Sequence, residues 1–262
     1  MSDKRINTQR TGYQEIFFSH QGKLSNKWSS YVDYYQEILA KYRKDRVKIL
    51  EIGVQNGGSL EILAKYFDQA QIVLGCDIDE KCGALKFEDP RINIIIGNTS
   101  DNKTFSKIRD HKYFEIIFDD GSHTSNDIIL NFINYFPLVA PGGIYIVEDT
   151  HFVHQTRVGL QEYSCIDFFK RISDLPNLQF WQGQRDPFDH LSGFFSPTPI
   201  HQIGQISVSV DAVEFRNSMI TIRKSKKDVL DKLGLQSIVG TVALVDNTPL
   251  LIRNARQHDD NQ

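Results

Sequence analysis

Residues 47–58 read VKILEIGVQNGG, an apolar run that passes directly into a glycine-rich turn. A short run of aliphatic and β-branched residues that ends at a glycine predicts a buried strand. Residues 60–66 then carry apolar side chains at helical spacing, so the turn joins a strand to a helix. Repetition of this unit along a chain builds a parallel sheet that helices cover on both faces.

Further apolar runs follow and alternate with stretches of helical periodicity. They predict strands at Ile72–Asp77, Ile92–Gly97, Phe114–Phe118 and Ile144–Val147. An amphipathic stretch at Asn126–Phe136 predicts a helix between the last two strands. Because parallel sheets bind ligands at the carboxyl ends of their strands, we expect a site where these runs end.

The two ends of the chain differ from this pattern. Tyrosines and aliphatic residues recur at helical spacing from Tyr31 to Tyr42, and we expect this helix to end in the charged run Lys41 to Arg46. Residues 160–172 also look helical, and the runs Ile206 to Val210 and Val213 to Arg223 predict two antiparallel strands. The predicted fold is therefore α/β and Rossmann-like, with antiparallel C-terminal strands added to a mostly parallel seven-stranded sheet.

The composition is that of an ordinary globular protein, with 40% hydrophobic and 24% charged residues and a net charge of −3 over 262 residues. This chain lacks the basic excess that general nucleic-acid or membrane-surface binding requires. It has no apolar stretch long enough to span a membrane, no apolar signal-peptide core and only three cysteines. We expect a cytoplasmic protein that binds neither nucleic acid nor membrane.

The glycine-rich turn predicts a ligand without a phosphate group. Its spacing E-x-G-x-x-x-G, from Glu51 through Gly53 to Gly57, differs from the dinucleotide fingerprint, and no phosphate-binding Lys-Ser/Thr pair follows. Glycines let the backbone pass close to a ligand, although any tight strand-to-helix turn also uses them. The Glu51 carboxylate would repel a pyrophosphate but could hold an ammonium group.

Two further strand ends offer groups for a nucleoside. Asp77 ends the second strand, where a carboxylate can accept hydrogen bonds from both ribose hydroxyls. The alternatives are that Asp77 is a solvated loop residue or that Asp79 takes this role. The polar residues 97–101 suit an adenine edge, and simple turn chemistry explains them as well.

Acidic residues and histidines follow two strands. DDGSH stands at 119–123 and EDTH at 148–151, and adjacent strand ends would crowd these like charges unless a cation or protons offset them. Oxygen ligands without a thiolate favour Mg²⁺ or a similar ion over zinc. The alternative is that residues such as Asp119 and Ser122 cap helix N-termini. The predicted metal ligands are Asp120, Glu148 and Asp149.

His123 lies three residues beyond Asp120, close enough to serve a hydroxyl held on such an ion. An imidazole changes charge near neutral pH, so His123 is the predicted general base; the alternative is an exposed loop histidine. His151 and His154 are weaker candidates for substrate contacts. Aromatic residues in 176–200 would either cover an acceptor or pack against the sheet edge. They are Trp181, Phe188, His190, Phe194 and Phe195.

Together, EIGVQNGGS, GCDID, DDGSH and GGIYIVEDTH resemble the metal-dependent class I S-adenosylmethionine O-methyltransferases, in particular those of the mycinamicin and demethylmacrocin type that act on macrolide deoxysugars. The resemblance covers roughly residues 20–155, and the later strands match only as a pattern. It implies S-adenosylmethionine and Mg²⁺ or a similar divalent cation as cofactors, and a sugar-containing small molecule as acceptor. It departs from that group at Trp28, near which the relatives carry a histidine, and at Asn98, where they often carry Asp.

The resemblance also implies roles by position. His123 and Asp120 would be catalytic, and Asp120, Glu148 and Asp149 would bind the metal. The chain would divide into a helical segment at 1–45, a methyltransferase domain at 46–225 and an extension at 226–262 with a disordered end. A homo-oligomer built through the N-terminal helix is expected. The donor-binding residues would be Glu51, Gly53, Asn56, Gly57, Asp77, Thr99, Ser100 and Asp119.

Two other functions fit the same motifs. The fold and metal could act on a phenolic or other small polar acceptor, since phenols ionise more readily and depend less on a base. The chain could also be a non-catalytic donor-binding scaffold, although a scaffold has no need for a repulsive acidic cluster. A nicotinamide-dependent dehydrogenase is disfavoured by the glycine spacing.

Overall fold

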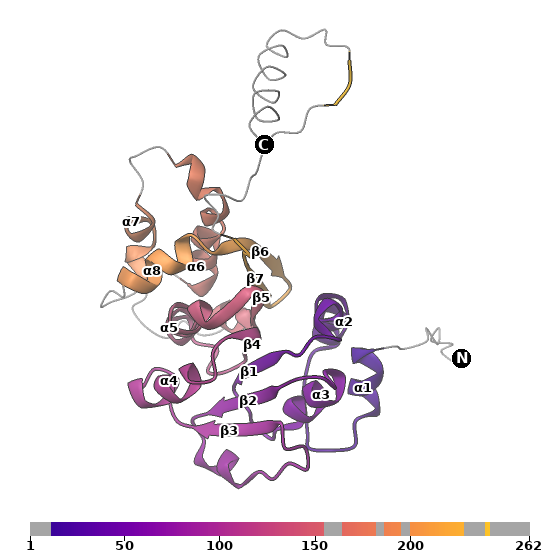
Figure 1. The fold of residues 1–262 in the computed structure, drawn as a ribbon. Helices are drawn as coiled ribbons and strands as arrows, with labels where there is room; N and C mark the ends of the chain where they lie inside the picture. Colours follow the sequence, from indigo (N-terminus) through magenta and orange to yellow (C-terminus); the bar gives the residue numbers. More distant parts are fainter. Residues whose placement is uncertain (1–11, 155–163, 182–185, 195–199, 228–238, 242–262) are drawn as a thin grey trace, which may run out of the picture.

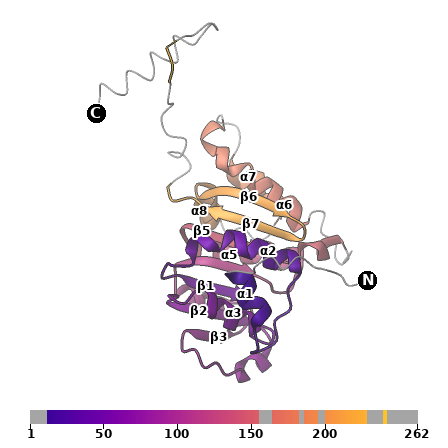
Figure 2. The same cartoon turned by 90° about the vertical axis from the view of Figure 1, so that its right-hand side faces the viewer.

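The computed structural model describes residues 12–154, 164–181, 186–194, 200–227 and 239–241. Within these ranges the strands form one sheet in the order β3-β2-β1-β4-β5-β7-β6 (Figure 1). β1 to β5 run parallel. Beyond β5, β7 pairs antiparallel with β5, and β6 pairs antiparallel with β7 (Figure 2). The predicted fold class is confirmed. The strands are β1 (Lys48–Ile52), β2 (Ile72–Asp77), β3 (Ile92–Ile96), β4 (Phe114–Asp119), β5 (Val139–Val147), β6 (Val210–Arg216) and β7 (Met219–Lys224).

Helices cover both faces of the sheet and bury an apolar core on each (Figure 1). The first three helices pack on one face and the later ones on the other. The α-helices are α1 (Tyr13–Ser19), α2 (Ser29–Ile38), α3 (Gly58–Tyr66), α4 (Asn102–Arg109), α5 (Ser125–Tyr135), α6 (Cys165–Ile172), α7 (Pro187–Leu191) and α8 (Ile200–Ser207). The 3-10 helices are η1 (Ala40–Tyr42), η2 (Glu80–Ala84), η3 (Phe136–Leu138), η4 (Thr150–His154), η5 (Leu175–Phe180) and η6 (Ser192–Phe194).

The N-terminal segment belongs to the same core as the sheet. Tyr13 of α1 and Tyr35 of α2 are buried, and Tyr35 packs edge-to-face on Phe118 of β4 at 5.3 Å between ring centroids. The helix predicted to run into Lys41–Arg46 ends earlier, at Ile38, and η1 carries the chain to Tyr42. The aromatic face of α2 therefore lies directly over the strands that lead to the site.

The antiparallel end of the sheet differs from the predicted elements. Ile206 lies in α8, and β6 begins at Val210. The run Val213–Arg223 is divided between two strands, because Arg216 pairs with Met219 and the residues between them form a tight turn. Ser218 in that turn has φ 63°. Left-handed residues suit a two-residue hairpin, but an Asn-Ser pair marks one less clearly than Asn-Gly does.

β5 begins at Val139, five residues before the predicted Ile144, and it includes the Pro141-Gly142-Gly143 stretch. The pairing with β4 is irregular between Phe114 and Ile116, where that stretch interrupts the ladder. Proline and glycine inside a strand are typical of such irregular pairing, because proline offers no backbone donor. The apolar run alone therefore marks only the regular half of this strand.

Residues 175–194 form short helices where they are described, rather than a loop over a site. Trp181, Phe188 and Phe194 pack against the apolar core on that face of the sheet. His190 contacts the Trp181 ring edge-to-face at 5.0 Å between centroids. These contacts support packing against the sheet rather than a cover over the acceptor, and Phe195 lies outside the described residues.

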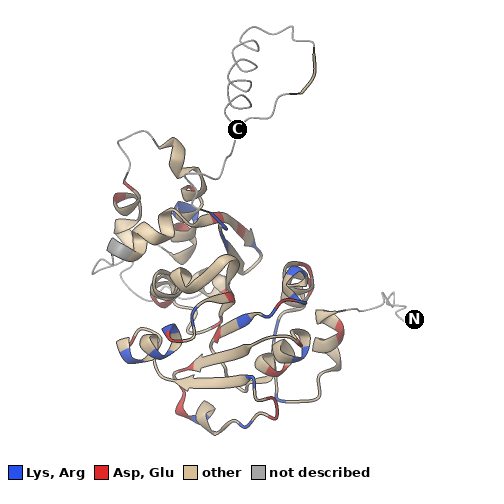
Figure 3. Ribbon diagram, in the orientation of Figure 1, with Lys and Arg blue, Asp and Glu red and all other residues tan. Residues whose placement is uncertain are grey.

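Charged residues of both signs are distributed over the ribbon (Figure 3). Among the described helices, none combines the length and the apolar character that a bilayer crossing needs. The amphipathic helices instead bury their apolar sides against the sheet. This arrangement leaves the carboxyl edge of the parallel strands for polar groups.

Candidate active site

The carboxyl ends of the parallel strands open into one cavity of about 430 Å³. The turns after β1, β2, β3, β4 and β5 all contribute to its wall, and residues 24–27, which connect α1 to α2, close one side. Of the predicted site residues, those that line it are Glu51, Gly53, Asp77, Thr99, Asp120, His123 and Asp149.

The turn after β1 depends on Gly53. Its φ is 90°, and a Cβ there would lie 2.0 Å from the carbonyl oxygen of Asp120. The β1 and β4 turns therefore touch backbone to backbone, which only a glycine permits. This contact fixes the spacing between the glycine-rich turn and the acidic residues after β4.

Glu51, the next-to-last residue of β1, faces the cavity although it is only 1% exposed. Its Oε2 has no hydrogen-bond partner among the residues that the structure describes. Burial raises the pKa of Glu51 to about 7, while the charge of Lys27 works in the opposite direction. A buried carboxylate oxygen without a partner is a place where a cationic ligand group fits.

Asp77 is held toward the cavity by the backbone. Its carboxylate accepts hydrogen bonds from the N–H groups of Val54 at 2.7 Å and Gln55 at 3.0 Å, and from Asp79 at 2.8 Å. Burial raises the pKa of Asp77, but these hydrogen bonds outweigh burial and the pKa is lowered overall. Asp79 instead caps η2 by accepting from the Lys81 N–H, so the geometry favours Asp77 for the ribose role.

Of the other residues predicted to bind the methyl donor, some line the cavity and others do not. Thr99 lines the cavity and donates to Asn131 Oδ1 at 2.8 Å. Ser100, Asn56 and Gly57 are not among the lining residues, and the Ser100 N–H bonds the Asn98 side chain within the turn. Their donor-binding roles stay predictions.

Asp119 lies beneath the cavity rather than in it. It is 2% exposed, accepts from Tyr145 at 2.8 Å and Asn131 at 3.2 Å, and has its pKa raised to about 7 chiefly by burial. It is not a helix cap, because Thr124 caps α5 by accepting from the Asp127 N–H. Asp119 therefore supports the floor of the site through Asn131.

Asp120, His123 and Asp149 come together at the adjacent ends of β4 and β5, with one ligand atom from each within 4.8 Å of the others. His123 Nε2 lies 3.9 Å from Asp120 Oδ1 and 3.7 Å from Asp149 Oδ2. His123 and Asp149 have positive φ, 58° and 55°. Such backbone strain in non-glycine residues concentrates at functional sites.

The side chains around this cluster fix its orientation. The His123 ring stacks on Phe152 at 5.2 Å between centroids. Asp149 Oδ1 accepts from the Tyr31 hydroxyl at 2.8 Å and from Trp28 Nε1 at 3.2 Å. Both donors come from the beginning of α2 and the residue before it, so the N-terminal segment helps to build the site.

Lys27 is one of the site residues that the sequence did not predict. Its Nζ lies 2.5 Å from Asp120 Oδ2 and 2.8 Å from both oxygens of Glu148, and its side chain is 4% exposed. Burial lowers the pKa of Lys27, but the charges of Glu148, Asp120 and Glu51 raise it well above its ordinary value. A single lysine in an irregular segment, 93 residues from Asp120, gives no sequence signal.

Glu148 is buried beside the cluster but outside it. Both of its oxygens accept from Lys27, and one also accepts from the Tyr35 hydroxyl. Burial raises its pKa above the ordinary value. Its role as a metal ligand stays a prediction, because Lys27 and Tyr35 hold the atoms that would bind an ion.

The donor set fits a hard divalent cation. Two carboxylates and an imidazole converge within ligand distance of one ion, and all three residues also line the cavity. Carboxylate oxygens with an accessible side match the preference of Mg²⁺ for oxygen ligands and for retained water or substrate. The residues present are therefore suited to the ion that the motifs imply.

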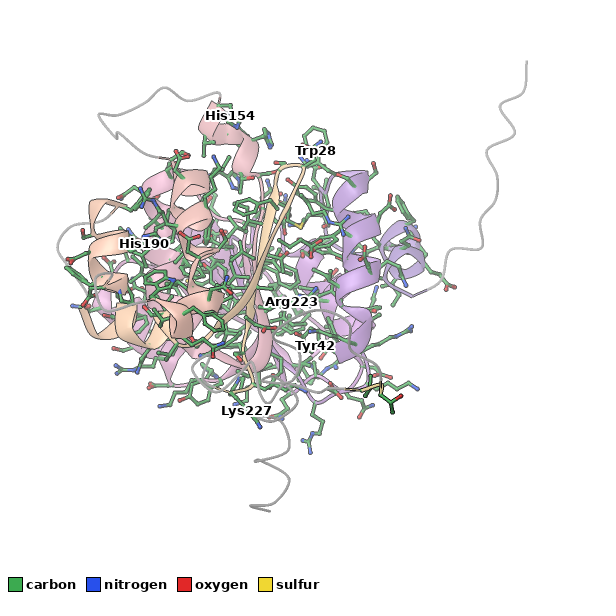
Figure 4. All side chains as sticks on the ribbon, turned by 90° about the horizontal axis from the view of Figure 1, so that it is seen from above. Trp28, Tyr42, His154, His190, Arg223 and Lys227 are labelled. Carbon is green, nitrogen blue, oxygen red and sulfur yellow. The ribbon has the colours of Figure 1, made fainter. Side chains whose placement is uncertain are left out.

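A second cavity of about 260 Å³ adjoins the first and shares Lys27, Asp120 and Asp149 with it. Trp28, Tyr31, His151 and Phe152 complete an aromatic wall. Trp28 is 60% exposed and lies in the same part of the molecule as the exposed His154, away from Lys227 (Figure 4). His151 lines the second cavity, whereas His154 lines neither of the two.

Comparison with known proteins agrees with this architecture. The family model described as rhamnosyl O-methyltransferase/CmcI matches residues 16–162. Demethylmacrocin O-methyltransferase of Streptomyces fradiae is 33% identical over 138 residues, which are 48% of this chain and 34% of that protein. Mycinamicin VI 2''-O-methyltransferase of Micromonospora griseorubida is 35% identical over 127 residues, which are 45% of this chain and 31% of that protein.

The solved structure of MycE methyltransferase in complex with Mg and SAH is similar in fold. It superposes with a TM-score of 0.65 at 21% identity, over 94% of this chain and 60% of that one. A further MycE complex holds Mg, SAH and mycinamycin VI, with a TM-score of 0.63 at 21% identity over 88% of this chain and 58% of that one. The chain thus matches about a third of the length of these curated relatives.

Proposed function

The chain belongs to the rhamnosyl O-methyltransferase/CmcI family, and we propose that it transfers a methyl group from S-adenosylmethionine to a hydroxyl of a sugar or glycosylated small molecule. One observation carries this proposal: a single cavity joins Asp77 and Glu51, whose Oε2 has no partner among the described residues, to the cluster of Asp120, His123 and Asp149. Donor-binding groups and groups that activate a hydroxyl therefore face the same space.

The donor half follows from the charges and hydrogen-bonding groups of the wall. Glu51 Oε2 would accept from the ammonium group of the methionine part, which supplies the hydrogen bond that this buried oxygen lacks among the described residues. Asp77 would accept from the ribose hydroxyls, and Thr99 would lie beside the adenine. Gly53 keeps the turn free of a side chain there.

A divalent ion, Mg²⁺ by donor preference, would be held by Asp120 and Asp149, with Glu148 as the third predicted ligand. When bound, the ion would supply positive charge that stabilises the deprotonated acceptor hydroxyl. Asp149 is oriented for this role by Tyr31 and Trp28. Two hydrogen-bond donors thus orient the Asp149 carboxylate.

His123 would accept the proton of the acceptor hydroxyl as the methyl group moves. The oxygen forms a bond to the methyl carbon, the carbon–sulfur bond breaks, and S-adenosylhomocysteine leaves with the electron pair on sulfur. The imidazolium formed would lie between Asp120 and Asp149, at 3.9 and 3.7 Å from their oxygens, which stabilises its charge. Stacking on Phe152 keeps the ring in position.

The second cavity would hold the sugar. Its aromatic wall of Trp28, Tyr31 and Phe152 offers flat apolar faces against which the CH surface of a sugar can pack, and Asp120 and Asp149 lie at its edge. The name of one Streptomyces olivaceus relative, 8-demethyl-8-alpha-L-rhamnosyl tetracenomycin-C 2'-O-methyltransferase, includes a rhamnosyl group. That name supports a deoxysugar as the first acceptor to test.

The test is a methyl-transfer assay with labelled S-adenosylmethionine and Mg²⁺, which compares rhamnosyl compounds with catechols. We expect label on the sugar, loss of turnover in Asp120→Asn and unchanged S-adenosylhomocysteine affinity in that variant. Transfer only to catechols would support the phenolic alternative. Donor binding without transfer to any acceptor would support a scaffold.

A further inference from the structure

The buried ammonium of Lys27 is a cation already present at the acidic cluster. It lies 2.5 Å from Asp120 Oδ2 and 2.8 Å from both Glu148 oxygens, while the side chains of Lys27 and Glu148 are 4% and 1% exposed. Asp120 is one of the residues that can hold a divalent ion. The lysine therefore occupies carboxylate oxygens that such an ion would also use.

We propose that Lys27 is a resident counter-ion that competes with the divalent cation for Asp120 and Glu148, so that it sets the metal affinity of the site. This inference rests on the proposed metal site and adds a residue that controls it. With Lys27 in place, an ion has Asp120 Oδ1 and Asp149 Oδ2 available, and His123 keeps its proposed role as the base. Withdrawal of Lys27 makes Glu148 Oε2 available as a further ligand, while Tyr35 still donates to Oε1.

Electrostatics makes the two cations alternatives. Glu51, Asp120 and Glu148 surround Lys27, so removal of its charge without replacement leaves the buried Glu51 and Glu148 and the partly exposed Asp120 without their counter-ion. A divalent ion on the same oxygens would meet the ammonium at close range, and like charges repel. The acidic group is therefore balanced either by Lys27 or by the ion.

The chain around Lys27 allows such an exchange. It stands in residues 20–28, which form neither helix nor strand, and the segment is anchored before it by Lys23 on Glu61 and by the Gly58 N–H on the Leu24 carbonyl. Residues 24–27 line the large cavity. Movement of Lys27 beyond this anchor would leave the fold intact and change the wall of the cavity.

The first test is Mg²⁺ titration of Lys27→Met by calorimetry and by thermal unfolding. We expect Mg²⁺ affinity to increase about tenfold or more, because the competitor is gone and the carboxylates are unpaired. Without Mg²⁺ the variant should unfold at a lower temperature than the wild type, and Mg²⁺ should raise its unfolding temperature by more. Lys44→Met, at an exposed lysine away from the site, is the control, and Lys27→Arg retains the competing charge; both should bind Mg²⁺ as the wild type does.

A second measurement uses the wild-type chain and does not depend on a variant that folds. Lys27 should resist acylation without Mg²⁺ and become reactive at saturating Mg²⁺, as followed by peptide mass spectrometry, while Lys23 reacts equally in both conditions. Equal or weaker Mg²⁺ binding by Lys27→Met, or continued protection of Lys27 at saturation, would overturn the proposal while the metal site stands. Absence of Mg²⁺ binding in both proteins would overturn both. Competition without methyl transfer would leave the inference intact and refute the proposed activity.

Discussion

Glu51 places a carboxylate oxygen without a described partner against a cavity, which destabilises its charged form. The pKa of Glu51 is raised to about 7 by burial, so the folded chain holds a proton that the unfolded chain releases near its ordinary value of 4.5. The folded state then binds more protons between these two values. Stability must therefore fall as pH rises through this interval.

Replacement by glutamine removes this titration. We expect Glu51→Gln to gain stability relative to the ligand-free wild type as pH rises from about 5 to 8, by up to roughly 3 kcal/mol. Urea unfolding of both proteins at the two pH values measures the difference. Glu15→Gln, at an exposed position of α1, is the matched control. A Glu51→Gln difference that does not change with pH would contradict this assignment.

His123 is the group for which the proposed chemistry makes the clearest kinetic prediction. His123→Ala should lower kcat by about 10²–10⁴-fold, the usual contribution of a general base. The affinity for S-adenosylhomocysteine should stay unchanged, because the proposed donor contacts come from Glu51 and Asp77 rather than from His123. Normal turnover in this variant would show that another group accepts the proton.

At the same scale, the sequence could predict part of the cluster. Asp120, His123 and Asp149 were predictable because adjacent parallel strands end at one edge, which brings their following residues together. Lys27 and Tyr35 were not, since they reach the site from an N-terminal segment whose path over the sheet has no local signature. Asp119 was predicted to bind the donor; strand alternation turns it into the interior, against Tyr145, and its donor-binding role stays a prediction.

Among the elements, the turn between β1 and α3 is the one whose backbone position matters most to the site. Gly53→Ala would place a Cβ 2.0 Å from the Asp120 carbonyl at φ 90°. We expect a loss of roughly 1–3 kcal/mol or more in unfolding free energy, together with weaker donor binding, because the turn must shift. Gly204→Ala in α8 is the control: its Cβ meets no atom within 4 Å, and it should stabilise the helix by about 0.5–1 kcal/mol. Equal effects of both changes on stability and donor binding would contradict the close-contact argument.

How clearly the sequence marks a strand depends on where the strand lies in the sheet. β1, β2 and β4 are mostly buried parallel strands and β3 is a partly buried parallel edge strand, and an apolar run marks each of them. β6 and β7 form an antiparallel pair with partly exposed residues, and α8 precedes them with a similar aliphatic content. A short apolar run cannot separate helix from strand there, which is why Ile206 was assigned wrongly.

On the scale of the whole molecule, the two halves of the site are joined by tertiary contacts rather than by sequence proximity. α2 packs its tyrosines on one face of the sheet and sends Tyr31 to Asp149 and Tyr35 to Glu148. Because of these contacts, a change in the N-terminal segment should alter catalysis as well as stability. The predicted segment boundaries at 45 and 226, the homo-oligomer and the cytoplasmic location stay predictions.

Tyr31→Phe tests this coupling between the helix and the site. It removes the hydroxyl that donates to Asp149 at 2.8 Å and accepts from the Asp149 N–H at 3.1 Å, while the ring remains in the core. We expect a loss of about 1–2 kcal/mol in unfolding free energy and a lower methyl-transfer rate. Gln14→Leu, at an exposed hydrogen bond from α1 to Asp33, should leave the rate unchanged. An unchanged rate in Tyr31→Phe would separate the helix from catalysis.

The most direct test of the account is the rate of methyl transfer from labelled S-adenosylmethionine to a rhamnosyl acceptor before and after removal of divalent ions, with donor binding measured in parallel. The account predicts that chelation abolishes transfer, that added Mg²⁺ restores it, and that S-adenosylhomocysteine binds in both conditions. Equal transfer rates with and without divalent ions would contradict it.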